Sequence, residues 1–180
     1  MYRLDQAWSV SSGLARALLD RGEATWLAGD YETARHYFNQ SREMHLVAGD
    51  LRILALLHLL DGYTSLAQGD AQNASEAFWQ GLAHFQGLGQ PGGTAMALAG
   101  LGALAEQRGK LSQAVRLYAA ADLPRRILMR DFILWPSGHT LYRHVLAGAH
   151  ARLHSPAFAN AWAEGGHLTL EQAVEYAQSP

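Results

Sequence analysis

Two short patterns in the chain have spacings that a metal ion or a nucleotide could use. His150 and His154 lie four residues apart, so on a helix they share one face and could chelate a metal ion. No carboxylate or Cys joins them at ligand spacing, and we interpret them as histidines of a polar face. The string GLGQPG, residues 87–92, matches the G-x-G-x-x-G pattern of dinucleotide-binding loops. Because that pattern must follow a strand and a helix is expected here, a turn between helices is the better interpretation.

Carboxylate pairs and one histidine are the candidates for acid–base chemistry. Asp20 with Glu23, and Glu171 with Glu175, have helical spacing. Paired carboxylates act as acid and base when an apolar pocket gives the two groups different pKa values. The sequence implies no such pocket around these pairs. His58 lies in an apolar segment, where a hydrogen-bonded core or groove histidine is more common than a catalytic one. We therefore expect no catalytic residue, no metal site and no cofactor.

Charge and composition exclude several classes of partner. A basic cluster contains Arg116, Arg125, Arg126 and Arg130. Asp122 and Asp131 dilute this cluster, and the net charge of −2 leaves no electrostatic footprint for nucleic acid or an anionic membrane. The lack of Cys suits a reducing cytoplasm, and the sequence does not open with a charged-then-apolar signal pattern. We expect a cytoplasmic protein that makes no direct contact with nucleic acid or membrane.

The elements that must position these residues repeat with a period of 40 residues. The period aligns Gly29-Asp30, Gly69-Asp70 and Gly109-Lys110. Residues at equivalent positions of the three units form columns of similar type. Downstream of the turns these columns are Ala34, Ala74 and Ala114, then Phe38, Phe78 and Tyr118, and upstream Gly22, Gly62 and Gly102. Such a period predicts stacked units that each bury one face against the next, which is typical of a binding scaffold.

Each period is predicted to form two antiparallel helices joined by a tight turn. A glycine in the left-handed conformation ends the first helix, and Asp30 or Asp70 caps the second. Gly49 and Gly89 end the second helix in the first two units, and Asp50 caps the following unit. The expected helices cover about 11–28, 31–48, 51–68, 71–88, 92–108 and 111–123.

The C-terminal part departs from the period. Pro124 is expected to break or kink the second helix of the third unit. Three shorter helices are expected to follow, starting at about His139, at Ser155-Pro156 and at Thr169. We therefore divide the chain into repeats over 1–128, a linker loop over 129–138 and a helical capping module over 139–180.

Two features of the capping module support its role as a cover. Thr169 and Gln172 have the spacing of a capping box, which marks the start of the last helix. Phe158 and Trp162 lie four residues apart and share a face of the preceding helix. Short helices are marginal alone, so we expect both to be docked, with Trp162 largely buried against the repeats.

The small and aromatic columns resemble the tetratricopeptide pattern, whose period is about 34 residues. Two segments point further: AGLGALAEQRGKLSQAVRLYAAAD at 99–122 and AWAEGGHLTLEQAVEYA at 161–177. Together they resemble the C-terminal end of large bacterial regulators of the LuxR-type and related ATPase families. The repeats themselves predict an all-α superhelix of antiparallel helix pairs with a C-terminal cap, and the resemblance covers only this repeat end of those regulators. Those proteins carry an ATPase module and often a DNA-binding domain, but neither motif is present here, so neither activity is carried over to any residue.

The first helix of each unit is expected to line a concave groove. By register the groove residues are Arg16, Leu19, Glu23 and Trp26, then Leu56, Leu59, Tyr63 and Leu66, and finally Met96, Ala99, Ala103 and Glu106. The middle of this groove is apolar, with Trp26 and Tyr63 as candidate anchors. In the alternative, Leu56 to Leu60 is core, because a helix that is apolar on nearly all sides is usually buried. The C-terminal helices could also fold back into the groove.

The resemblance, together with the repeat fold, implies two candidate functions. The leading hypothesis is a non-catalytic interaction or sensing domain of a bacterial signalling or transcription regulator, whose partner is a protein or peptide, for example another domain of a larger regulator. The alternative is an effector-binding module that recognises a small molecule. An open groove would favour the peptide binder, whereas a deep closed pocket would favour the small-molecule sensor.

Overall fold

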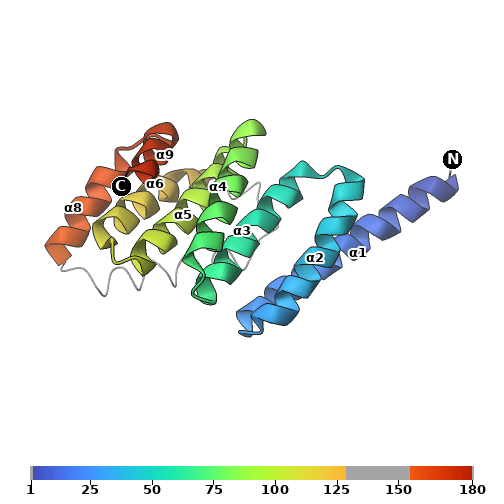
Figure 1. The fold of residues 1–180 in the computed structure, drawn as a ribbon. Coiled ribbons are helices and arrows are strands. Elements are labelled where there is room, and N and C mark those ends of the chain that lie inside the picture. Colours follow the sequence, from blue (N-terminus) through green and yellow to red (C-terminus); the bar gives the residue numbers. More distant parts are fainter. Residues whose placement is uncertain (1, 129–154, 180) are drawn as a thin grey trace.

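The computed structural model of the chain describes residues 2–128 and 155–179 (Figure 1). Within these ranges every regular element is a helix, which confirms the prediction of an all-α fold. The helices are α1 (Tyr2–Leu27), α2 (Tyr31–Ala48), α3 (Leu51–Ala67), α4 (Ala71–Gly87), α5 (Pro91–Gln107), α6 (Leu111–Leu128), α8 (Ser155–Gly166) and α9 (Leu170–Gln178). None of the described helices has the length and hydropathy needed to cross a membrane.

A glycine with a positive φ lies in each of the five turns between α1 and α6. The residues are Gly29, Gly49, Gly69, Gly89 and Gly109, with φ angles of 86°, 70°, 80°, 61° and 79°. This left-handed conformation is strained for residues that carry a Cβ, so the turns depend on glycine. The side chains of Asp30, Asp50 and Asp70 then accept hydrogen bonds from the backbone N–H three residues later, at 3.1, 3.2 and 3.1 Å. The predicted turns and caps are confirmed.

The helices pack as successive pairs in a row (Figure 1). Figure 1 shows the pairs running from α1–α2 at one end to α5–α6 at the other, where α8 and α9 lie. Within each pair, a glycine of the first helix contacts an aromatic ring of the second. A Cβ added to Gly22, Gly62 or Gly102 would lie 2.6 Å from Phe38, Phe78 or Tyr118 respectively. The three rings are fully buried, so the glycine and aromatic columns of the sequence form the contact inside each pair.

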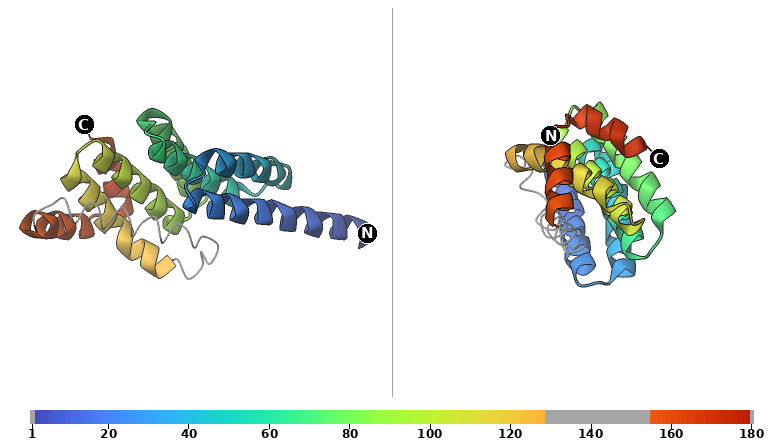
Figure 2. Two further views of the ribbon diagram at one scale, coloured as in Figure 1. Left: turned by 90° about the horizontal axis from the view of Figure 1, so that it is seen from below. Right: turned by 90° about the vertical axis from the view of Figure 1, so that its left-hand side faces the viewer.

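Neighbouring pairs contact through a second face of the first helix. A Cβ added to Gly93 or Gly100 of α5 would lie 2.0 Å from Phe85 or 2.4 Å from Phe78, both in α4. The positions 40 residues earlier, Ile53 and Leu60 of α3, are also buried. In α1 the corresponding positions are exposed, because no described helix precedes them. Figure 2 shows that α1 also extends beyond the rest of the row.

The C-terminal helices cover the third pair. Helix α8 packs on α6, and α9 packs on both α5 and α6. Gly165 of α8 lies so close to α6 that an added Cβ would be 2.3 Å from the carbonyl oxygen of Arg116. The capping box predicted at the start of α9 is present, with Gln172 N donating to Thr169 Oγ1 at 3.2 Å and Thr169 N donating to Gln172 Oε1 at 2.9 Å.

Three expectations are corrected. Trp162 is only half-buried: Ala161 and Gly165 take the inward positions of α8, while Trp162 stacks on Phe158 with ring centroids 5.7 Å apart. Helix α6 continues past Pro124 to Leu128, because a missing N–H close to the end of a helix removes one hydrogen bond without ending it. Helix α1 begins well before residue 11. The loop predicted over 129–138 and the helix predicted over 139–153 lie outside the described residues.

Candidate binding cleft

Most of the residues that were predicted to line an apolar concave groove are buried. They are Leu19, Glu23, Leu56, Leu59, Tyr63, Met96, Ala99 and Ala103. The physical reason is clearest in α3, which packs against α2, α4 and α5 and therefore buries side chains on several faces. Tyr63, for example, meets the Phe78 ring edge-on with centroids 4.9 Å apart. The burial agrees with the alternative that Leu56 to Leu60 is core, and these side chains do not offer an open apolar groove.

The other predicted groove residues are partly exposed and take part in local contacts. Arg16 pairs with Asp20 at 2.8 Å, and Trp26 lies beside Tyr31 with ring centroids 5.6 Å apart. Glu106 accepts a hydrogen bond from the hydroxyl of Tyr118 at 3.2 Å. Leu66 packs against the hydrophobic core. The structure therefore does not bring the twelve predicted residues together as one accessible surface.

His58 is half-buried and stacks on His84, with ring centroids 5.1 Å apart and an interplanar angle of 9°. Burial lowers the pKa of His58, with Arg42 and His84 adding to this effect and Asp61 opposing it. Arg42 forms an ion pair with Asp61 next to this stack. His58 is thus a packed histidine with charged neighbours, as expected for a core or groove position.

The remaining sequence candidates are placed as follows. Residues 87–92 form the end of α4, the turn and the start of α5, so the glycine string is an inter-helix turn. Glu171 and Glu175 are both exposed on α9, whereas Asp20 is exposed and Glu23 buried on α1. Within residues 2–128 and 155–179 no group of three or more His, Asp or Glu side chains gathers to hold a metal ion. His150, His154 and Arg130 lie outside these ranges.

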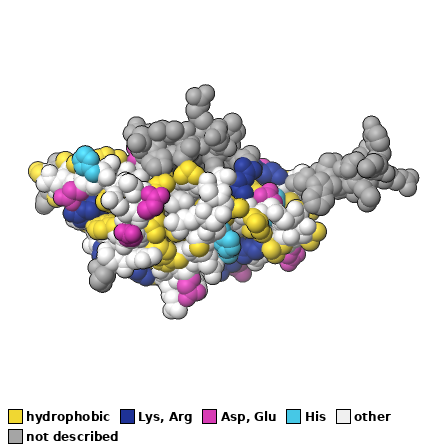
Figure 3. Space-filling view, turned by 90° about the horizontal axis from the view of Figure 1, so that it is seen from above, with side chains coloured by type: hydrophobic (Ala, Val, Ile, Leu, Met, Phe, Trp, Pro, Cys, Tyr) yellow, Lys and Arg dark blue, Asp and Glu magenta, His cyan; other side chains and the backbone are white. Residues whose placement is uncertain are grey.

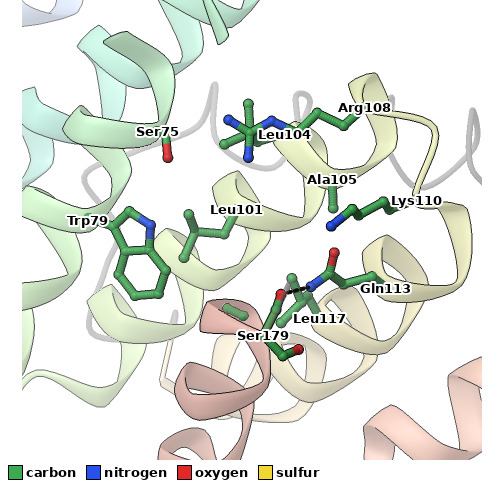
Figure 4. A pocket seen from close by; sticks show the side chains of 11 residues that line it. Ser75, Trp79, Leu101, Leu104, Ala105, Arg108, Lys110, Gln113, Leu117 and Ser179 are labelled. Atoms are coloured by element: carbon green, nitrogen blue, oxygen red, sulfur yellow. Dashed lines mark hydrogen bonds between the residues drawn. The ribbon is translucent and has the colours of Figure 1, made fainter. Parts of the chain in front are cut away.

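A cleft lies where the C-terminal end of α9 meets the repeats, and sequence reasoning missed it. We call it the α9 cleft. Its volume is about 70 Å³, and helices α4, α5, α6 and α9 contribute to it (Figure 4). Its lining consists of Ser75, Trp79, Leu101, Leu104, Ala105, Arg108, Lys110, Gln113, Leu117, Ala177 and Ser179.

Helical spacing places the apolar side chains of the α9 cleft. Ser75 and Trp79 are four residues apart on one side of α4, and Leu101 and Leu104 are three apart on α5. Leu101, Leu104 and Leu117 are buried and form the floor. Trp79 is half-buried against the hydrophobic core, and Figure 4 shows its ring standing as a wall opposite Leu101. The cleft therefore combines an aromatic wall with an aliphatic floor.

The opposite edge of the α9 cleft is basic. Arg108 and Lys110 flank Gly109 in the turn between α5 and α6, and both are exposed. Figure 4 shows the Lys110 side chain reaching toward the middle of the cleft and Arg108 extending along its edge toward α4. Nε2 of Gln113 donates a hydrogen bond to the carbonyl oxygen of Ser179 at 3.4 Å, which ties the end of α9 to α6. None of the described side chains lining the cleft is acidic.

An open depression continues from the basic edge of the α9 cleft. Its volume is about 450 Å³, and it shares Lys110, Gln113 and Ser179 with the cleft. Beyond them it reaches Tyr176 and Arg116, whose Nε donates to Glu164 at 2.6 Å and whose Nη1 donates to the Tyr176 hydroxyl at 3.2 Å. The two hollows form one extended surface with a narrow end at Trp79.

One signal in the sequence could have pointed to this surface. Lys110 is the only Lys of the chain and stands where Asp30 and Asp70 cap the helices of the earlier units. It therefore replaces a capping carboxylate by a cation at one turn alone. On the face of the molecule that Figure 3 shows, acidic and basic side chains are interspersed over the described residues.

Comparisons with known proteins give no match to this chain: no family model, no curated protein and no solved structure is similar to it.

Proposed function

We propose that this chain is a non-catalytic interaction module that binds a protein or peptide segment in the α9 cleft and the depression beside it. In this proposal the helix pairs form a tetratricopeptide-like superhelix of three repeats, and the module belongs to a cytoplasmic bacterial signalling or transcription regulator. The binding surface differs from the groove expected from the sequence, because α9 and the second helices α4 and α6 build it together with one first helix, α5.

The observation that carries the proposal is the shape and lining of the α9 cleft. Its volume of about 70 Å³ is far below the roughly 300–1,000 Å³ of sites that enclose a drug-sized molecule. It accepts one side chain, while the open depression next to it leaves room for the adjoining backbone. This geometry supports a peptide ligand over a small-molecule effector.

Trp79 is the expected anchor of this surface. Its ring is half-buried, so its orientation is fixed by the core while one part stays accessible. Tryptophan is among the residues that contribute most to binding energy at interfaces, because a rigid ring covers a large apolar area. A ligand side chain on the floor formed by Leu101 and Leu104 would contact this ring (Figure 4).

A random-peptide library displayed on phage tests the proposal, with the full chain immobilised. We expect enriched peptides to bind the wild type and to lose binding to Trp79→Ala. Ser75→Tyr is a second variant, which fills the cleft without removing a core contact. Val47→Ser is the matched control, because Val47 is 85% exposed at the distant α2–α3 turn. Circular dichroism confirms that each variant is folded. The proposal fails if no peptide is enriched, or if the enriched peptides bind both cleft variants as they bind the wild type.

A further inference from the structure

We infer that the ligand of the α9 cleft is an acidic peptide whose Asp or Glu carboxylate binds at the Arg108–Lys110 edge, next to an apolar side chain that packs on Trp79. This inference rests on the proposed function and specifies the chemistry of its ligand.

The first argument is charge complementarity. The α9 cleft has two cationic side chains at one edge, and no acidic side chain lines it. Arg16, Arg42 and Arg116 each form an ion pair with a carboxylate, namely Asp20, Asp61 and Glu164. Arg108 and Lys110, like Arg21, Arg35 and Arg52, make no ion pair with any residue in the described ranges; unlike those three, they line a cleft. Two uncompensated cations beside an apolar floor favour an anionic ligand.

The second argument is the donor chemistry of this edge. Arg108 offers a planar guanidinium that matches a carboxylate with two parallel hydrogen bonds, and Lys110 offers an ammonium that acts as a mobile point charge. Lys110 reaches from the turn toward the middle of the cleft, while Arg108 runs along its edge (Figure 4). Nε2 of Gln113 donates one hydrogen bond to Ser179, and among the described residues of the lining Arg108 and Lys110 are the only charged side chains that could pair with a carboxylate.

The third argument is the apolar surface next to the cations. The side chains of Leu101, Leu104 and Leu117 at the floor are 5%, 2% and 1% exposed, so the apolar surface that a carboxylate alone would leave open to water is chiefly that of the half-buried Trp79 ring. A ligand with an apolar residue beside the acidic one covers this floor and the Trp79 ring together. The depression beyond Lys110 is lined by polar and apolar groups alike and receives the continuing peptide.

The two cations have a competing role within the chain itself. The carbonyl groups at the end of a helix carry a partial negative charge, and α9 ends at the α9 cleft. Arg108 and Lys110 could therefore serve only to stabilise the end of α9. In that case their removal would lower the stability of the chain and leave its choice of peptide unchanged, so peptide selectivity separates the two roles.

The test uses fluorescein-labelled peptides of equal length, one alternating Leu and Glu and the other alternating Leu and Gln. Fluorescence anisotropy measures their affinity for the full-length chain. We expect the Glu peptide to bind about tenfold more tightly, and this preference to shrink at high salt. The double variant R108Q/K110Q should lose the preference, whereas R35Q/R52Q removes the same charge from α2 and α3 and should keep it.

The outcomes separate this inference from the function on which it rests. Equal affinities of the two peptides for the wild type overturn the acidic ligand, and so does a Glu preference that R108Q/K110Q retains. If neither peptide binds while library-selected peptides still depend on Trp79, the acidic ligand is wrong and the interaction module stands. If no peptide of any kind depends on Trp79, the proposed function itself is wrong.

Discussion

At the scale of single residues, the histidine stack between α3 and α4 contains a half-buried titratable group with charged neighbours. His58 is half-buried against His84, and the ion pair of Arg42 with Asp61 lies beside it. Burial penalises the imidazolium form of His58, and two positively charged or chargeable neighbours add to that penalty. This position therefore makes the stability of the chain depend on pH.

We expect His58→Gln to reduce the loss of stability that acid causes. Burial lowers the folded-state pKa of His58 below its ordinary 6.5, so the unfolded chain binds the proton more readily. The stability contributed by neutral His58 is fully present above pH 6.5 and is lost as the pH falls through the folded-state pKa. Urea unfolding at about pH 7.5 and about pH 5 should show a smaller difference for His58→Gln than for the wild type. The exposed His36→Gln serves as the control, and an equal effect of both variants would contradict this account.

At the scale of elements, the sequence predicted the helices well because the relevant signals are local. The turn glycines and the capping carboxylates act on backbone groups within a few residues, so their spacing placed α2 to α5 within about a residue of their observed bounds. The glycine and aromatic columns predicted closely packed units, whereas the contact that they make inside each pair was not predicted and comes from the structure. Pro124 misled the prediction, because the loss of one N–H does not by itself end a helix.

A substitution at Gly62 tests the contact inside a helix pair directly. An added methyl group would lie 2.6 Å from the Phe78 ring, so Gly62→Ala should destabilise the chain by about 1–3 kcal/mol through overpacking. Gly87→Ala is the matched control, because nothing lies within 4 Å of its added Cβ. Alanine is favoured over glycine in helices by about 0.5–1 kcal/mol, so this variant should be neutral or slightly stabilised. Urea denaturation measures both, and equal stabilities would argue against a tight contact at Gly62.

At the scale of the whole molecule, the proposed binding surface was less predictable than the fold. Helix α3 is apolar on nearly all sides, and its sequence is the same whether one face packs in the core or binds a ligand. The sequence therefore could not show that Leu56 and Leu59 are buried. The α9 cleft depends on where α9 docks, and docking brings Ala177 and Ser179 beside Leu101 and Gln113 from far along the chain. No local pattern encodes that juxtaposition.

Removal of residues 156–180 should lower the melting temperature and promote aggregation. Helices α8 and α9 cover α5 and α6, so the deletion exposes their apolar side chains to water. Ala173→Asp in the full chain is the companion variant, because Ala173 of α9 is fully buried and a carboxylate there weakens docking. Thermal melts and size-exclusion chromatography measure the effects. A truncated chain that stays monomeric and equally stable would show that these helices are not a cap, and would make Trp162 a candidate partner anchor.

Because Ala177 of α9 and its C-terminal cap residue Ser179 both line the α9 cleft, docking of the helix and occupancy of the cleft are thermodynamically linked. A ligand that binds only when α9 is docked holds the helix in place by mass action, and a docked helix raises the affinity for that ligand by the same factor. Amide hydrogen exchange in α9 would then report on occupancy without any label on the ligand. If the proposed function holds, the segment that closes the end of the row is also the one whose local unfolding sets how tightly a partner is held.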